Sequence, residues 1–342
     1  MEAMNQRLLY IDYIKALGII LVILYHCQYV PLNSMFIQGV YAICVPLFFM
    51  VNGYLMLRKQ YSIKALLKKN LKILVVLFVW AFISTGVSMG LNGEWGSTFN
   101  SGNAFLFNAL FIRKPYCNHL WFLKEIFVLN LLNPIIYSFI HADNKRLRYL
   151  LVILILCTVR FVDVVVSRFA NPLLGWQTSF SVLYYVLGFA LLEQKLFTDK
   201  LKTWQLVLVV GVAIIMQWLY NWVLIKGPLS SLNSEKQWVN DIVWDGYNAP
   251  CIVLLTSAIC LLFQRIPWRK CKWALFIGQY SLAIYVMQTP IQRIIQSVLP
   301  IQTWSVQWHI SGALLPILTL ITCALITRLM QTNRITNYLI TI

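Results

Sequence analysis

A carboxylate, an amine and an imidazole interrupt the first apolar run of the sequence, IDYIKALGIILVILYH. Asp12 and Lys15 lie near its start and His26 ends it. In an α-helix Lys15 and His26 share one face, about 16 Å apart along the axis, and Asp12 lies one turn before Lys15. Charges in hydrocarbon are costly and generally functional, so we expect this face to line a protein interior or a wet cavity. A neutral imidazole there could accept a hydroxyl proton or act as a nucleophile. The alternative is an Asp12–Lys15 ion pair at the interface and a His26 that only packs.

The helices that would position these residues are membrane spans. Of the 342 residues, 60% are hydrophobic and 11% charged, whereas about a quarter are charged in soluble proteins. Apolar runs long enough to cross a bilayer recur along the chain. They predict an all-α integral membrane protein with about ten transmembrane helices, cytoplasmic N- and C-termini and one domain over residues 1–342. The predicted spans are 10–30, 35–57, 73–90, 119–141, 149–167, 178–193, 204–225, 248–265, 274–296 and 311–331.

The net charge of +17 indicates topology in this interpretation. With the N-terminus in the cytoplasm, most of the 28 Lys and Arg residues fall on the cytoplasmic side, as the positive-inside rule describes. We therefore expect no nucleic-acid partner. The eight cysteines form no CxxC or Cys/His cluster, so the sequence predicts neither a disulfide framework nor a metal site.

Several short motifs follow one another in a definite order. After the Lys and His of the first run come VPLFFMVNGYLML, KKNLKI and HLWFL, and then YYVLGFAL, GQYSLAIYVMQTP and ITRLMQTNR. Each motif is short, but their order and spacing over the full chain resemble the membrane-bound acyltransferase-3 family. Members of this family O-acylate surface polysaccharides. Because the chain ends directly after the tenth predicted span, it is most similar to the standalone branch that lacks a fused esterase-like domain.

The resemblance implies an O-acyltransferase of the cell membrane. It would move an acyl group, acetyl by analogy, from cytoplasmic acyl-CoA to a hydroxyl of an extracytoplasmic glycan. The implied partners are acyl-CoA as co-substrate, a surface polysaccharide or lipid-linked sugar, and membrane lipid; no tightly bound cofactor is expected. His26 is the candidate general base or, in a two-step route, the acyl acceptor.

The donor phosphates are expected near basic side chains, because lysine binds phosphate as a point charge. The basic motif also suits a plain topological anchor, and that alternative stays open. The candidate donor-binding residues are Lys15 with its neighbour Asp12, and Lys68, Lys69 and Lys72 of KKNLKI.

Polar residues of other spans are candidates for acceptor binding or for supporting His26: Asn52, His119, Trp121, Arg160, Arg293, Gln288 and Tyr285. Asn52 stands where relatives more often carry Ser. Gln288 stands where they commonly carry His, and glutamine cannot exchange a proton. Arg160 can instead pair with Asp163 at i, i+3. By helical spacing, His119 and Glu125 are not expected to serve the same cavity.

Two other functions remain open at this point. A membrane transporter or flippase of a glycan or lipid-linked sugar would also need polar residues inside its spans, although the sequence shows no inverted repeat. An inactive or sensory relative is compatible with Gln288.

Overall fold

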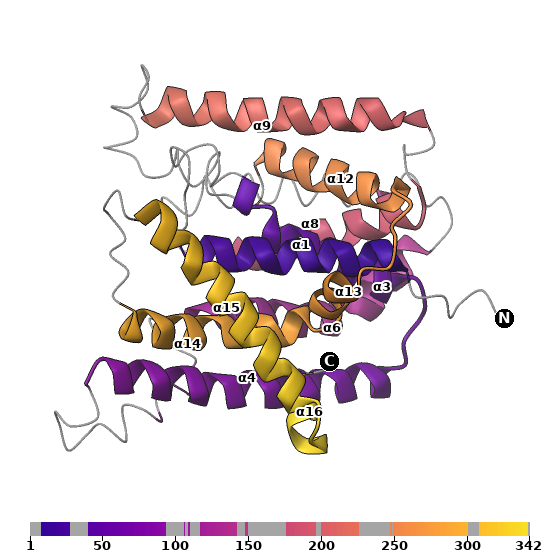
Figure 1. The fold of residues 1–342 in the computed structure, drawn as a ribbon. Helices are drawn as coiled ribbons and strands as arrows, with labels where there is room; N and C mark the ends of the chain where they lie inside the picture. Colours follow the sequence, from indigo (N-terminus) through magenta and orange to yellow (C-terminus); the bar gives the residue numbers. More distant parts are fainter. Residues whose placement is uncertain are drawn as a thin grey trace, which may run out of the picture. The chain divides into compact units, whose positions relative to one another are not determined.

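The computed structural model describes residues 8–27, 40–93, 106, 109, 117–141, 148–149, 176–195, 200–225, 247, 249–299 and 308–340. Within these ranges the secondary structure is helical and contains no strand, in agreement with the predicted all-α class (Figure 1). The helices are α1 (Leu9–His26), α3 (Cys44–Leu57), α4 (Ile63–Leu91), η2 (Asn118–Leu120), α6 (Trp121–Ile140), α8 (Trp176–Leu192), α9 (Thr203–Ile225), α12 (Pro250–Arg265), α13 (Lys272–Gln279), α14 (Ser281–Val298), α15 (Trp308–Met330) and α16 (Arg334–Ile340).

Two of the predicted spans need correction. The span predicted at 73–90 belongs to α4, which already begins at Ile63, because the Ser62 hydroxyl caps it by accepting a hydrogen bond from the Ala65 amide at 3.2 Å. The span predicted at 274–296 is two helices, α13 and α14, which are separated at Tyr280. Most of the span predicted at 149–167 lies outside the described residues, so the total of ten and the orientation of the termini stay predictions.

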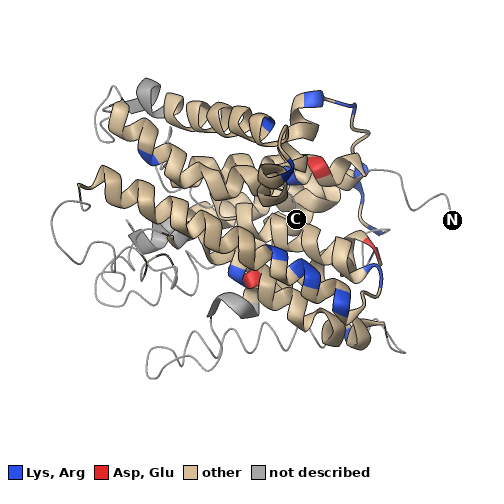
Figure 2. Cartoon of the chain, turned by 90° about the horizontal axis from the view of Figure 1, so that it is seen from below, with Lys and Arg blue, Asp and Glu red and all other residues tan. Residues whose placement is uncertain are grey.

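Several helices suit a bilayer. Among the described residues, four helical segments are long and apolar enough to span one: α1, α4, α6 and Ala313–Met330 of α15. Figure 2 shows helices that carry neither basic nor acidic residues over most of their length. The protein is therefore a membrane protein.

The chain divides into two compact units that are interleaved along the sequence. Unit 1 comprises Met1–Gly18, Leu32–Tyr61 and Leu132–Gly278, and unit 2 comprises Ile19–Pro31, Ser62–Leu131 and Gln279–Ile342. The prediction of one domain over the whole chain stays a prediction.

In unit 1, α3 packs closely against α8 through two glycines. A Cβ atom added at Gly53 would lie 1.8 Å from the Tyr185 carbonyl oxygen, and one added at Gly188 would lie 2.0 Å from the Met50 carbonyl oxygen. The two backbones touch at both glycines, so a side chain at either position would force the helices apart. The same unit contains α9 and α12, which pack together (Figure 1).

In unit 2, α14 is the central helix of the described part. It packs against α4, α15 and α16, and α15 crosses it obliquely (Figure 1). A buried amide pair links α4 to α6, where Asn130 donates to the side-chain oxygen of Asn70 at 2.9 Å. This unit contains His26, His119 and Arg293 together.

Candidate active site

His26 is the last residue of α1 and is partly buried. Its backbone carbonyl accepts a hydrogen bond from the Gln292 side chain of α14 at 2.9 Å. Its ring makes an edge contact with Tyr25, with 5.6 Å between centroids. Because α1 runs without a break from Leu9 to His26, the shared face predicted for Lys15 and His26 follows from the helix itself.

His119 is buried near His26. It lies in η2, directly before α6, and its exposed fraction is 3%. Its Nε2 atom lies 3.5 Å from the Ser84 hydroxyl of α4, and its backbone carbonyl accepts a hydrogen bond from the Tyr285 hydroxyl. The two imidazoles are close enough to interact electrostatically. This pair of histidines comes from segments more than 90 positions apart in the chain.

Pro290 explains why α14 offers a polar group to His119. Proline has no N–H, so within α14 the carbonyl of Val286, four residues earlier, lacks its usual helical donor. The Val286 backbone interacts with the His119 ring. The Nδ1 atom of His119 is buried and makes no hydrogen bond of ordinary geometry with the described residues. A freed carbonyl beside an imidazole favours one orientation of the ring.

Arg293 completes this group of polar side chains. Its guanidinium donates to the Ser88 hydroxyl of α4, and Ser88 in turn donates to the Ser84 carbonyl at 2.7 Å. Arg293 also interacts electrostatically with His119. We call His26, His119, Arg293, Ser84 and Ser88 the histidine cluster.

The histidine cluster combines two kinds of chemistry. Its imidazoles can take up and release a proton. Its guanidinium is a fixed positive charge with several donors, which suits an oxyanion or the hydroxyl groups of a sugar. Deprotonation of a hydroxyl and stabilisation of the resulting anionic intermediate are the two requirements of acyl transfer.

Two more predicted residues lie next to the cluster in unit 2. Gln288 is completely buried in α14, and its amide donates to the Thr289 hydroxyl at 2.9 Å, while its carbonyl oxygen has no hydrogen-bond partner among the described residues. Trp121 opens α6 and packs edge-on against Phe122. Neither arrangement tests a role in acceptor binding.

The basic motif lies on the first three turns of α4. Lys68 is exposed, whereas Lys69 and Lys72 are partly buried. Asn70, between them, faces α6 through Asn130, so helical geometry turns Lys68 and Lys72 to the opposite side of α4 and places Lys69 about 100° around the helix from Asn70. Lys72 lies over the Tyr338 ring of α16, 4.5 Å from its centroid.

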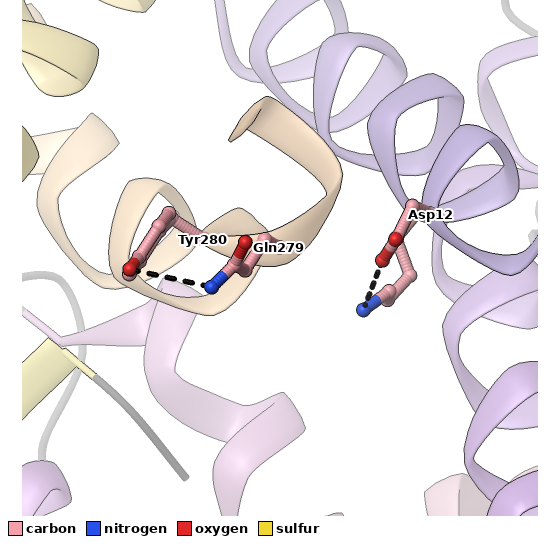
Figure 3. Close-up of polar contacts among 4 residues, drawn as sticks. Asp12, Gln279 and Tyr280 are labelled. Atoms are coloured by element: carbon pink, nitrogen blue, oxygen red, sulfur yellow. Dashed lines mark hydrogen bonds and ion pairs between the residues drawn. The ribbon is translucent and has the colours of Figure 1, made fainter. Parts of the chain in front are cut away.

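The Asp12–Lys15 ion pair belongs to unit 1. The Lys15 ammonium lies 3.1 Å from the Asp12 carboxylate, which is almost completely buried (Figure 3). Figure 3 also shows the Gln279 amide donating to the Tyr280 hydroxyl, a contact of 3.3 Å in unit 2. Asn52 lies on α3 in unit 1, and its amide nitrogen is buried without a hydrogen-bond partner among the described residues.

Arg160 and Asp163 lie outside the described residues. Ser84, Ser88 and Gln292 contact the predicted site residues but were not predicted from the sequence. Two serines four residues apart in an apolar helix were the available signal for Ser84 and Ser88.

Within the described ranges no three His, Cys, Asp or Glu side chains gather as a metal site.

Comparison with known proteins agrees with the motifs. No curated protein and no solved structure matches the chain. The family model described as an acyltransferase domain, that of acyltransferase 3, matches residues 8–328, which include α1 and almost all of α15. The chain is therefore an acyltransferase of the membrane-bound acyltransferase-3 family.

Proposed function

We propose that the protein is a multi-pass O-acyltransferase of the cell membrane. It transfers an acyl group, acetyl by preference, from cytoplasmic acyl-CoA to a hydroxyl of an extracytoplasmic glycan. The observation that carries the proposal is the placement of His26 at the end of an apolar helix, where it interacts electrostatically with the buried His119 imidazole, in a chain of the acyltransferase family.

In the proposed reaction His26 is the general base. The imidazole takes the proton of the acceptor hydroxyl while the hydroxyl oxygen attacks the thioester carbonyl carbon. The carbon–sulfur bond then breaks, and the proton leaves on the CoA thiol, so that charge and atoms balance. In the two-step variant an imidazole nitrogen of His26 attacks the thioester first, and the acyl group passes from it to the sugar oxygen.

Arg293 and His119 support this chemistry. The guanidinium, held by Ser88, provides a fixed positive charge for the oxyanion of the tetrahedral intermediate or for the acceptor. His119 is oriented by its contacts with Ser84 and with the backbone of Val286, and it interacts electrostatically with His26.

The donor side of the proposal rests on α4. The three lysines of KKNLKI lie on one side of its first three turns, where they can hold the phosphates of CoA. Lys15, paired with Asp12, is proposed to lie along the path of the pantetheine arm.

The decisive experiment is mass spectrometry of surface glycans from cells with and without the protein. Loss of a mass increment of about 42 Da, that of an acetyl group, identifies donor group and acceptor together. Purified protein incubated with radiolabelled acetyl-CoA supplies the second readout. Identical glycans in both strains, with no His26-dependent release of CoA, would contradict the proposal. Normal glycan translocation without acyl transfer would favour a transporter.

Arg293 separates the acceptor side from the donor side. We expect Arg293→Ala to lower turnover by about 10²- to 10³-fold, because one oxyanion donor is commonly worth that much, while affinity for CoA stays unchanged. Arg293→Lys keeps the charge but loses the planar fork, and it should restore activity only in part. A defect in CoA binding would place Arg293 on the donor side and overturn this assignment.

A further inference from the structure

The C-terminal helix α16 contacts the basic motif of α4. It packs against both α4 and α14 within unit 2, and its last residue, Ile340, is buried. Its Tyr338 ring lies under the Lys72 ammonium, 4.5 Å from the centroid. Tyr338 and Ile340 lie beyond residue 328, where the family match ends.

Tyr338 remains accessible in this position. Its exposed fraction is 45%, although Lys72 covers part of the ring. Lys69 lies one turn before Lys72 on the same side of α4, since residues three apart in a helix are neighbours. An exposed aromatic surface therefore lies next to the Lys72 ammonium, and Lys69 follows one turn earlier on the same side of α4.

This combination matches one part of the proposed donor in particular. The nucleotide of CoA carries an adenine ring and several phosphates, whereas its pantetheine arm has no aromatic group. Aromatic side chains stack on bases, and lysines hold phosphates as point charges.

We propose that Tyr338, with Lys72 and Lys69, forms the adenine-nucleotide subsite of the acyl-CoA donor. The Tyr338 ring stacks on adenine, and the two lysines bind the nucleotide phosphates. The cation–π contact holds the Lys72 ammonium beside the Tyr338 ring. The assignment rests on the proposed function, because it presumes an acyl-CoA donor.

The test compares two ligands that differ only in the nucleotide. Calorimetric titration of the purified full-length protein with CoA and with 4′-phosphopantetheine measures both affinities. The wild-type protein should bind CoA more tightly than 4′-phosphopantetheine. Tyr338→Ala should weaken the affinity for CoA by about tenfold, which is usual for the loss of one stacked base. Its affinity for phosphopantetheine should stay within roughly twofold of wild type, because no stacking is lost.

Two further variants serve as controls. Tyr338→Phe keeps the aromatic face and should bind both ligands like wild type. Tyr338→Leu keeps apolar bulk without an aromatic face, so it replaces the alanine variant if the latter is poorly folded. If Tyr338→Ala binds CoA like wild type, or loses equal affinity for both ligands, the subsite is rejected. Such a result would not contradict the proposed acyltransferase function. A wild-type protein that binds neither ligand would instead reject the proposed donor.

Discussion

The two units hold their helices together by different means. In unit 1, α3 and α8 meet backbone to backbone at Gly53 and Gly188. In unit 2, α4 and α14 are joined by a polar contact between Arg293 and Ser88, and the same helix α4 reaches His119 through Ser84. Close glycine contacts maximise van der Waals packing, which is the main source of helix association in a bilayer.

Polar contacts inside a membrane protein have a different value. Each such contact contributes only about 0.6 kcal/mol on average to the free energy of folding. We therefore expect the contacts of the histidine cluster to add little to stability. We therefore expect close packing to matter most for folding in unit 1, and the proposed site residues to matter most for activity in unit 2. Substitutions should therefore separate into those that damage folding and those that damage catalysis.

The largest expected effect is on catalysis in unit 2. His26→Ala should lower acyl transfer by about 10²- to 10⁴-fold, the contribution of a general base, with unchanged thermal stability. His26→Gln keeps size and hydrogen bonding but cannot exchange a proton, so it should be equally inactive. Rates of CoA release and melting in detergent check both. An active glutamine variant would show that the imidazole is not the base.

Gly53→Ala should act on folding in unit 1. The added methyl group meets the Tyr185 carbonyl at 1.8 Å, and such overpacking costs about 3 kcal/mol or more. Thermal melting and the yield of folded protein measure the loss. Gly211→Ala in α9 is the matched control, because nothing lies within 4 Å of its added Cβ; it should be neutral or stabilising. Equal behaviour of the two variants would reject the close contact.

In unit 1, the Asp12–Lys15 pair is the part of the proposed donor-binding set that can be tested by substitution. Asp12→Ala leaves Lys15 without its partner at 3.1 Å, which should cost about 2 kcal/mol for a partly exposed pair.

The double variant Asp12→Asn, Lys15→Gln removes both charges and should recover most of that stability. Melting of wild type and of the two variants shows how much stability the double variant recovers, and their KM values for acyl-CoA separate a structural from a donor-binding role. If the recovered double variant also has a wild-type KM, Lys15 has only a structural role.

The smallest effect is expected at the basic end of α4. Lys69→Ala and Lys72→Ala should each raise KM for acyl-CoA roughly two- to fivefold, because charge pairs that water still reaches are worth little. Added salt should diminish the difference. Lys64→Ala, an exposed lysine of the same helix outside the motif, is the control and should match wild type. Equal KM values for all three variants would reduce the lysines to topological anchors.

Helices were the most predictable feature. Long apolar runs predicted α1, α6, α9 and α12 close to their observed bounds, because burial in lipid and helix formation both follow from local composition. The start of α4 was missed because a basic segment was assigned to a loop. Its helical signal was the Ser62 cap, which is local but short.

The site was predictable only in part. His26, His119, Tyr285 and Arg293 were all candidates, and the structure brings them together in unit 2. It could not be predicted that Ser84 and Ser88 would hold two of them, since a serine in an apolar helix generally bonds to its own backbone. Gln292 was missed because its partner is a backbone carbonyl, which has no sequence signal.

The sequence by itself determined that this is an all-helical membrane protein of the acyltransferase-3 family with a histidine at the end of its first apolar helix. Composition, periodicity and ordered motifs are properties of the chain, so no packing was needed to see them. Only the tertiary structure decided which polar residues meet: Ser84 with His119, 35 residues apart, and Ser88 with Arg293, 205 residues apart. Contacts over such separations depend on how whole helices pack, and the local sequence around each serine does not predict that packing.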